Sequence, residues 1–174
     1  MLAGCGEGQP TPASPASQPA STAPASKPTP AASRSPGASA SVATQSAQLF
    51  FEADGKLVPE QTQVSTASPL RQSLEQLLRG PKDTAHFTEI PKSSQLLDVS
   101  LANGTATVSL DHAFFGPGGA TAALVRVGQV VYTATQFPDV RSVQLLDEGK
   151  PPGPIGEGLS VNRPLTRQDF SQVA

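Results

Sequence analysis

The chain has 174 residues, a formal net charge of −2 and a single cysteine. One cysteine excludes an intrachain disulfide and a cysteine metal cluster, and the lack of any Lys/Arg cluster argues against nucleic acid, whose binding depends on phosphate neutralisation. No stretch reaches the roughly 18 apolar residues of a membrane-spanning helix. The composition leaves room for one folded domain of ordinary size.

The first motif along the chain is Leu2-Ala3-Gly4-Cys5, the pattern found at the cleavage site of bacterial lipoprotein signal peptides. Small residues before the cysteine let an extended backbone enter the processing enzyme, and the thiol accepts diacylglycerol. A signal peptide also needs a basic segment and roughly 7 to 15 apolar residues, which are not present before Cys5. We interpret residues 1–5 as the remnant of such a peptide, with a chance Ala-Gly-Cys as the alternative, and predict an extracytoplasmic protein whose lipidated Cys5 binds the membrane.

Residues 6–46 consist almost entirely of Pro, Ala, Ser, Thr, Gly and Gln. Such a segment cannot bury enough apolar surface to offset its ordering entropy, so we predict a disordered linker. Its prolines favour an extended spacer of about 3.1 Å per residue. The folded domain is expected to cover residues 47–174.

The first elements of that domain are two strands and a helix. The apolar run at 48–52 and the extended run at 56–64 flank Asp54-Gly55, which predicts a hairpin, and Pro59 places the second strand at a sheet edge. Ser68 and Pro69 are typical of a helix start. Leucines at 70, 74, 77 and 78 form one apolar stripe, and Gly80-Pro81 ends the helix.

A second hairpin, a second helix and a last strand follow. Alternating apolar residues at 97–101 and 106–110 flank Asn103-Gly104, the strongest short-range hairpin signal. Within 120–137, polar residues 126, 129, 133 and 136 recur at helical spacing, so we predict an amphipathic helix that Pro138 ends. Residues 140–147 are predicted to form a strand, and the remainder to be loop with a docked C-terminal tail.

This order predicts an α+β fold: a small mixed or antiparallel sheet with two helices packed on one face, preceded by the disordered Pro/Ala/Ser linker. Several segments also resemble the GerMN domain of sporulation and spore-germination proteins, a domain found too in LpqB-type lipoproteins. They are 68–69, 74–81, 90–91, 106–111, 128–140, 143–145, 149–151 and 162–170. The resemblance implies a non-catalytic envelope domain that binds another protein and needs no cofactor. Since this chain holds one copy of the domain, not two in tandem, it does not identify the partner.

Possible interface residues lie beside the second helix and in the tail. Gly118 and Gly119 precede the helix, so their region could offer free backbone N–H groups to an anion or a peptide carboxylate. Phe114 and Phe115 form either core or an exposed apolar patch. The tail supplies two cations for acidic groups across an interface, Arg163 and Arg167.

Enzymatic and metal-binding alternatives find little support in the sequence. Asp111 and His112 are adjacent, so on a strand they would point to opposite faces, and no serine lies on a nucleophile elbow. His86 and His112 with Asp98 or Asp111 show no metal-ligand spacing. The glycines at 153, 156 and 158 lack the following helix of a dinucleotide site. We therefore predict no catalytic, metal or cofactor site, and keep a binder of a wall polymer or small ligand as the alternative and a hydrolase as the third possibility.

Overall fold

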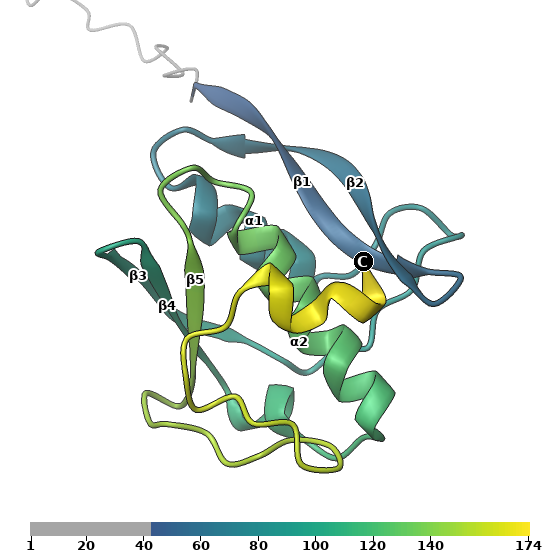
Figure 1. Ribbon diagram of the computed structural model, residues 1–174. Coiled ribbons are helices and arrows are strands. Elements are labelled where there is room, and N and C mark those ends of the chain that lie inside the picture. The colour runs from purple at the N-terminus through teal and green to yellow at the C-terminus, as the bar shows by residue number, and fades with distance from the viewer. Residues whose placement is uncertain (1–42) are drawn as a thin grey trace, which may run out of the picture. The chain divides into compact units, whose positions relative to one another are not determined.

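The computed structural model describes residues 43–174, so the predicted lipidation site at Cys5 and most of the predicted linker lie outside the described residues. Residues 43–174 form five strands, two α-helices and two short 3₁₀ helices (Figure 1). In order these are β1 Thr44–Ala53, β2 Lys56–Ser65, α1 Pro69–Leu78, β3 Leu96–Ala102, β4 Thr105–Leu110, η1 His112–Phe115, α2 Ala120–Ala134, β5 Ser142–Asp147 and η2 Arg167–Val173. The predicted order of strands and helices is confirmed.

The strands form two sheets rather than the single small sheet that the sequence suggested. β1 and β2 make an antiparallel pair, and β3, β4 and β5 make a second sheet in that order. The second sheet is mixed, because β3 and β4 are antiparallel whereas β4 and β5 are parallel. Both helices pack against each other and against both sheets (Figure 1). The α+β class is therefore confirmed. The two helices pack on both sheets, instead of on one face of a single sheet.

Two tight turns set the register of the hairpins. The backbone φ angles are +52° at Asp54 and +79° at Gly55, and +52° at Asn103 and +81° at Gly104. Positive φ at both central residues is the geometry that Asp-Gly and Asn-Gly favour, and its twist matches that of the flanking strands. β1 begins at Thr44, before the predicted domain start at residue 47, because its polar first residues pair with the end of β2.

The first helix follows its sequence signals in all but one detail. Pro69 is its first residue, Leu74 and Leu77 are buried, and Gly80 has a φ of +91° just after its end. The side chain of Ser68 makes no capping hydrogen bond, although Ser68 occupies the N-cap position. The helix start is therefore specified by the proline and the apolar stripe rather than by the serine hydroxyl.

The second helix departs from its amphipathic prediction. It ends at Ala134, before Pro138, and the predicted polar face is buried. Arg126 is 4% exposed, and Gln129 and Thr133 are not exposed at all. A helix packed between two sheets has little surface left for solvent, so its polar side chains must find hydrogen-bond partners inside the protein.

The C-terminal tail is docked, as the sequence predicted, and the structure places it against α2. Phe170 and Val173 of η2 are buried. A Cβ atom added to Gly128 would lie 3.1 Å from Cδ1 of Leu57 and 3.5 Å from Cδ1 of Phe170. Glycine at this position therefore lets the helix approach both β2 and the tail closely.

The carboxylate of Asp169 holds the start of η2 and makes the stability of the fold depend on pH. Asp169 accepts hydrogen bonds from Arg163, from the Thr166 amide and from the Thr166 hydroxyl. The Arg163 guanidinium and the Thr166 amide lower the pKa of Asp169 to about 2. A depressed pKa means that the stabilisation is present above the unfolded-state pKa of about 3.9 and is lost as the pH falls through the folded-state value.

We expect Asp169→Asn to lower the free energy of unfolding by about 1 kcal/mol at pH 7, the usual worth of a helix cap. The difference from wild type should shrink as the pH falls from about 4 to about 2. Urea titrations followed by circular dichroism at several pH values measure it, with the exposed Glu157→Gln as a matched control. A difference that stays constant down to pH 2 would contradict the assignment.

Candidate functional site

The structure first settles the position of the two phenylalanines that the sequence left open. Phe114 is fully buried, and Phe115 packs edge-on against it with ring centroids 5.2 Å apart. Phe114 therefore belongs to the core, and Phe115 is partly buried against it. Of the two alternatives that the sequence left open for these residues, the structure supports the core, because η1 turns their side chains inward.

A buried arginine, Arg126, donates hydrogen bonds to the backbone next to the glycine loop before α2. Nε of Arg126 donates to the Glu89 carbonyl at 2.9 Å, and its Nη1 donates to the carbonyls of Phe114 at 2.8 Å and Gly116 at 3.0 Å. A Cβ atom on Gly118 would lie 3.0 Å from Nη2 of the same guanidinium. Burial lowers the pKa of Arg126 below its ordinary value. Gly118 and Gly119 themselves are exposed, and they lead directly into α2.

The two tail arginines already have partners within the chain. Arg163 is 2.6 Å from Asp169. Arg167 donates from Nε to Oγ1 of Thr135 at 2.8 Å, and its guanidinium lies 4.8 Å from the ring centroid of Tyr132. Arg167 thus helps to dock the tail onto α2, whereas Arg163 pairs within the tail itself.

Each of the two histidines forms a hydrogen bond with a carboxylate, and sequence inspection did not identify either contact. Nδ1 of His112 lies 2.8 Å from Oδ2 of Asp147, and Nδ1 of His86 lies 3.1 Å from Oε2 of Glu60. Burial opposes ionisation of Glu60, but hydrogen bonds from His86 and two backbone amides lower its pKa overall. Within residues 43–174, no serine, threonine or cysteine hydrogen-bonds to either histidine, and no three metal-ligating side chains cluster.

The His112–Asp147 pair gives a testable titration. The hydrogen bond that His112 donates to the Asp147 carboxylate raises the pKa of His112 above its ordinary value of 6.5. A raised histidine pKa means that this pair stabilises the fold fully below about pH 6.5 and ceases to do so as the pH rises through the folded-state pKa. We expect NMR titration of the imidazole to show this elevation, and Asp147→Asn to bring the pKa back toward 6.5, whereas Asp139→Asn leaves it unchanged. A wild-type value at or below 6.5 would refute the pairing in solution.

None of the helices in the described part of the chain is both long enough and apolar enough to cross a membrane.

The outer edge of β1 is closed by hydrogen bonds from other elements. The Gln48 amide donates to the side chain of Gln136, and the Phe50 amide donates to Oγ1 of Thr133 at 3.1 Å. The Glu52 amide and carbonyl both bond to the backbone of Phe87. Side chains at the end of α2 and the backbone of Phe87 thus occupy the outer edge of β1.

The outer edges of β2 and β5 are also covered in part. The Ser65 amide donates to Gln72, and the Gln63 carbonyl accepts from Gln76, so α1 covers the end of β2. Pro59 lies on this edge, as predicted, and has no N–H to leave unpaired. On β5, Val143 exchanges two backbone hydrogen bonds with Leu165.

The outer edge of β3 differs from the other three. Since the two-residue turn makes Ala102 and Thr105 a hydrogen-bonded pair, alternation directs the backbone N–H and C=O groups of Val99 and Leu101 away from β4. Among the described residues, no hydrogen bond reaches these groups. Of the three large hydrophobic residues that are exposed in the described chain, two lie on β3: Leu97 at 46% and Leu101 at 44%.

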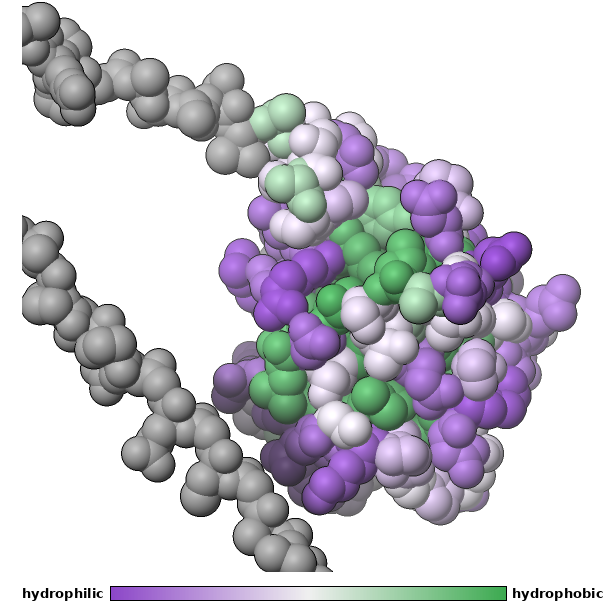
Figure 2. All heavy atoms as spheres, turned by 90° about the vertical axis from the view of Figure 1, so that its left-hand side faces the viewer, coloured by the Kyte–Doolittle hydropathy of each residue, from purple (hydrophilic) through white to green (hydrophobic). Residues whose placement is uncertain are grey.

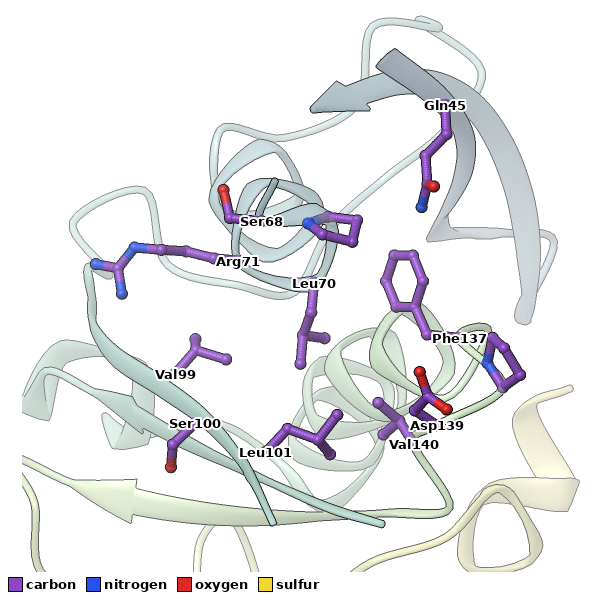
Figure 3. Close-up of a pocket in the computed structure, with 12 residues that line it drawn as sticks. Gln45, Ser68, Leu70, Arg71, Val99, Ser100, Leu101, Phe137, Asp139 and Val140 are labelled. Carbon is purple, nitrogen blue, oxygen red and sulfur yellow. The ribbon is translucent and has the colours of Figure 1, made fainter. Parts of the chain in front are cut away.

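An apolar groove lies beside this open edge, and we call it the β3 groove. Its volume is about 450 Å³. It lies between the start of α1, the inner face of β3 and the loop after α2, and its apolar lining comprises Leu70, Val99, Leu101, Phe137, Pro138 and Val140 (Figure 3). Hydrophobic side chains gather in the middle of this face of the molecule (Figure 2).

The polar side chains around the β3 groove do not converge on a reaction centre. Arg71 points away from the middle of the groove (Figure 3) and forms an ion pair with Glu75 at 3.0 Å. The arrangement therefore suits apolar side chains of another molecule and offers no paired acid and base. The alternation of Leu97, Val99 and Leu101 in the sequence predicts that these side chains are buried. It does not reveal that the folded protein covers this strand only in part.

Comparisons with known proteins agree with this fold. A family model for sporulation and spore germination matches residues 44–153. The tandem GerMN domains of the sporulation protein GerM from Bacillus subtilis are 19% identical with a TM-score of 0.63, and the match covers 78% of this chain and 50% of that chain. This chain thus spans about half the length of that tandem structure. No curated protein matches the sequence.

Two further solved structures have the same fold. The first GerMN domain of that GerM protein is 20% identical over 71% of this chain and 98% of its own, with a TM-score of 0.60. A structure described as "Putative Lipoprotein from Clostridium perfringens" is 21% identical over 75% of this chain and 92% of its own, with a TM-score of 0.54. Because the family model spans more than half of the sequence, the chain belongs to the sporulation and spore germination family, and its folded part is a GerMN-type domain.

Proposed function

We propose that this protein is an extracytoplasmic lipoprotein, anchored to the membrane through Cys5, whose GerMN-type domain is a non-catalytic docking module for another envelope protein. The observation that carries the docking role is the β3 groove beside an unpaired strand edge. Extended peptides commonly bind by adding a strand to such an edge, with alternate side chains entering pockets beside it.

The chemistry of the groove favours a protein partner over a polysaccharide. Leu70, Leu101 and Phe137 offer apolar contact surface, whereas a wall polymer would need several convergent hydrogen-bonding groups. The anchor rests on separate support: the Leu-Ala-Gly-Cys motif and the likeness to a structure described as a lipoprotein.

The test is affinity purification from membranes of the chain expressed behind a complete lipoprotein signal peptide, compared with the same chain carrying Cys5→Ser. Two further variants of the anchored form separate the groove from the rest of the surface. Leu101→Glu places a charge in the groove, and Phe87→Glu places one at a similarly exposed apolar residue elsewhere.

A protein that co-purifies with the anchored wild type and with Phe87→Glu, but with neither Leu101→Glu nor Cys5→Ser, supports both the anchor and the docking role. Retention of wall fragments by all forms, without any enriched protein, overturns the docking role in favour of the ligand-binding alternative.

A further inference from the structure

The guanidinium of Arg126 has one amino group that no other group uses. Nε and Nη1 donate to three backbone carbonyls, whereas Nη2 makes no hydrogen bond within residues 43–174. Arg126 is 4% exposed, yet Nη2 is not enclosed as the unpaired hydroxyls of Ser73 and Ser94 are, so it is accessible from solvent. A nearly buried side chain therefore presents two free N–H donors at the surface.

Nη2 points at the glycine loop, residues 116–119, that precedes α2. A Cβ atom added to Gly118 would lie 3.0 Å from Nη2 but 4.0 Å from Cζ of the guanidinium, so the amino group is the part that faces this residue. The same Cβ atom would lie 3.7 Å from Cβ of Ala122, in the first turn of α2. Glycine at position 118 therefore leaves open a space between Nη2 and the start of the helix.

The start of α2 adds further donors without partners. Its N-cap residue, Gly119, has no side chain to cap the helix, and the first turn contains no acidic residue. The first N–H groups of a helix have no acceptor within the helix. In the described chain no other backbone carbonyl accepts a hydrogen bond from the amides of residues 118–122. These amides, together with the helix dipole, make this end of α2 electropositive.

The positive charge of Arg126 has no counter-ion in the described part of the chain. None of the ion pairs among residues 43–174 includes Arg126. The Glu89 carboxylate counters the lowering of the Arg126 pKa but forms no ion pair with it. Since buried charges in proteins are usually paired, the guanidinium lacks a negative partner on the side that faces the glycine loop.

We propose that Nη2 of Arg126, the glycine loop and the first turn of α2 form a binding site for a phosphate group. The donors favour phosphate over carboxylate. Because Nε and Nη1 are already occupied, the guanidinium cannot offer the planar fork that holds a carboxylate with two parallel hydrogen bonds. The free donors belong to a side chain and to the backbone, which suits a tetrahedral group whose oxygens point in several directions.

The site goes beyond the proposed function and leaves the β3 groove free. α2 has 15 residues, so its start lies about 20 Å from its end. The β3 groove is lined by the loop after that end. A phosphate group and a protein partner can therefore bind to the same copy of the domain.

Phosphate titration followed by NMR tests the site in the full chain carrying Cys5→Ser, which has no thiol to be lipidated. Chloride is replaced by inorganic phosphate at constant ionic strength. We expect the amide signals of Gly118, Gly119 and Thr121 and the Nε–H signal of Arg126 to shift and to saturate. Acetate in place of phosphate should bind about tenfold more weakly, because it cannot use donors in several directions.

Gly118→Ala is the decisive variant, because it fills the space beside Nη2 without removing a hydrogen bond of Arg126. We expect it to weaken phosphate binding about tenfold, as the loss of one charge-assisted hydrogen bond would. The matched control is Gly153→Ala, at an exposed glycine where an added Cβ atom meets nothing within 4 Å. Neither glycine has a positive φ, so both positions accept alanine.

Vesicles distinguish the two sources of a phosphate group. Co-sedimentation with phosphatidylglycerol vesicles that is lost in Gly118→Ala, and absent with phosphatidylcholine vesicles, assigns the site to a lipid headgroup. Binding of inorganic phosphate without binding to vesicles assigns it to a free phosphate ester.

Three outcomes overturn the proposal. Without a saturable shift at residues 118–126, there is no phosphate site. Acetate that binds as tightly as phosphate refutes phosphate as the ligand. Unchanged phosphate binding by Gly118→Ala, with its fold checked by circular dichroism, shows that the ligand does not enter the space beside Nη2.

Discussion

Replacing Arg126 with methionine is expected to lower the free energy of unfolding by about 3 kcal/mol, within the range for breaking a buried polar network. Methionine fills a similar volume but leaves the carbonyls of Glu89, Phe114 and Gly116 without their donor. The bond to Phe114 is buried and the bonds to Glu89 and Gly116 are partly buried, and a buried acceptor left unpaired costs roughly 1 to 3 kcal/mol. Removing a buried charge recovers part of this cost, because the guanidinium itself was desolvated. The cost of leaving three carbonyls without a donor is larger than this gain, because those backbone groups remain in place after the substitution.

The conservative variant Arg126→Lys separates charge from geometry. A lysine keeps the positive charge but lacks the planar fork that serves carbonyls on two sides. We therefore expect Arg126→Lys to be destabilised nearly as much as Arg126→Met, with a melting temperature lowered by about 10 °C in either case. Thermal unfolding followed by circular dichroism measures both, and Arg79→Met, at an exposed arginine, is the matched control. Full stability of Arg126→Lys would show that only the charge matters.

Local chemistry accounts for the parts of the fold that the sequence predicted well. Asp54-Gly55 and Asn103-Gly104 specify their turns through backbone preferences of the residues themselves, and Pro69 with Gly80 delimits α1 in the same way. None of these signals depends on what lies elsewhere in the chain. The elements were therefore predictable to within a few residues, whereas their grouping into two sheets was not.

The side of α2 that faces the core shows why the rest was not predictable. Its polar spacing correctly indicated a helix, but Thr133 bonds to Phe50, 83 residues away, and Gln129 to Phe87, 42 residues away. Periodicity reports that polar residues share a face; it carries no information on whether water or distant backbone satisfies them. In the described chain such long-range contacts close the outer edge of β1, the outer edges of β2 and β5 are covered in part, and only a structure shows that β3 is left open.

The same limit applies to the candidate interface residues. Aromatic and arginine side chains such as Phe114 and Arg167 are common in interaction surfaces. Here Phe114 is fully buried, and Arg167 stacks on Tyr132. In contrast, Leu101 belongs to an alternating apolar pattern that is typical of buried strand residues, yet it is 44% exposed and lines the β3 groove (Figure 3). Exposure of an apolar strand residue depends on the position of the covering helix, which the strand's own sequence does not encode.

Phe170→Ala is expected to lower the free energy of unfolding by about 3 to 5 kcal/mol, the usual cost of truncating a buried phenylalanine. Phe170 lies beyond the residues 44–153 that match the family model, yet its side chain is fully buried beside Gly128. Truncation would leave a cavity between α2 and η2 that the rigid helix cannot close. The surrounding contacts of Arg167 with α2 would hold the tail only weakly without it, since those groups are partly solvated.

The decisive measurement is whether this loss appears in the global transition. If the tail is part of the same cooperative unit as α2, urea unfolding of Phe170→Ala followed by circular dichroism shows a single transition at lower denaturant with an unchanged slope. The matched control Gln172→Ala, at an exposed residue of η2, should unfold as wild type does. A Phe170→Ala transition that coincides with wild type, accompanied by rapid proteolysis after residue 153, would instead show that residues 154–174 are an appendage and that the folding unit ends where the family match ends.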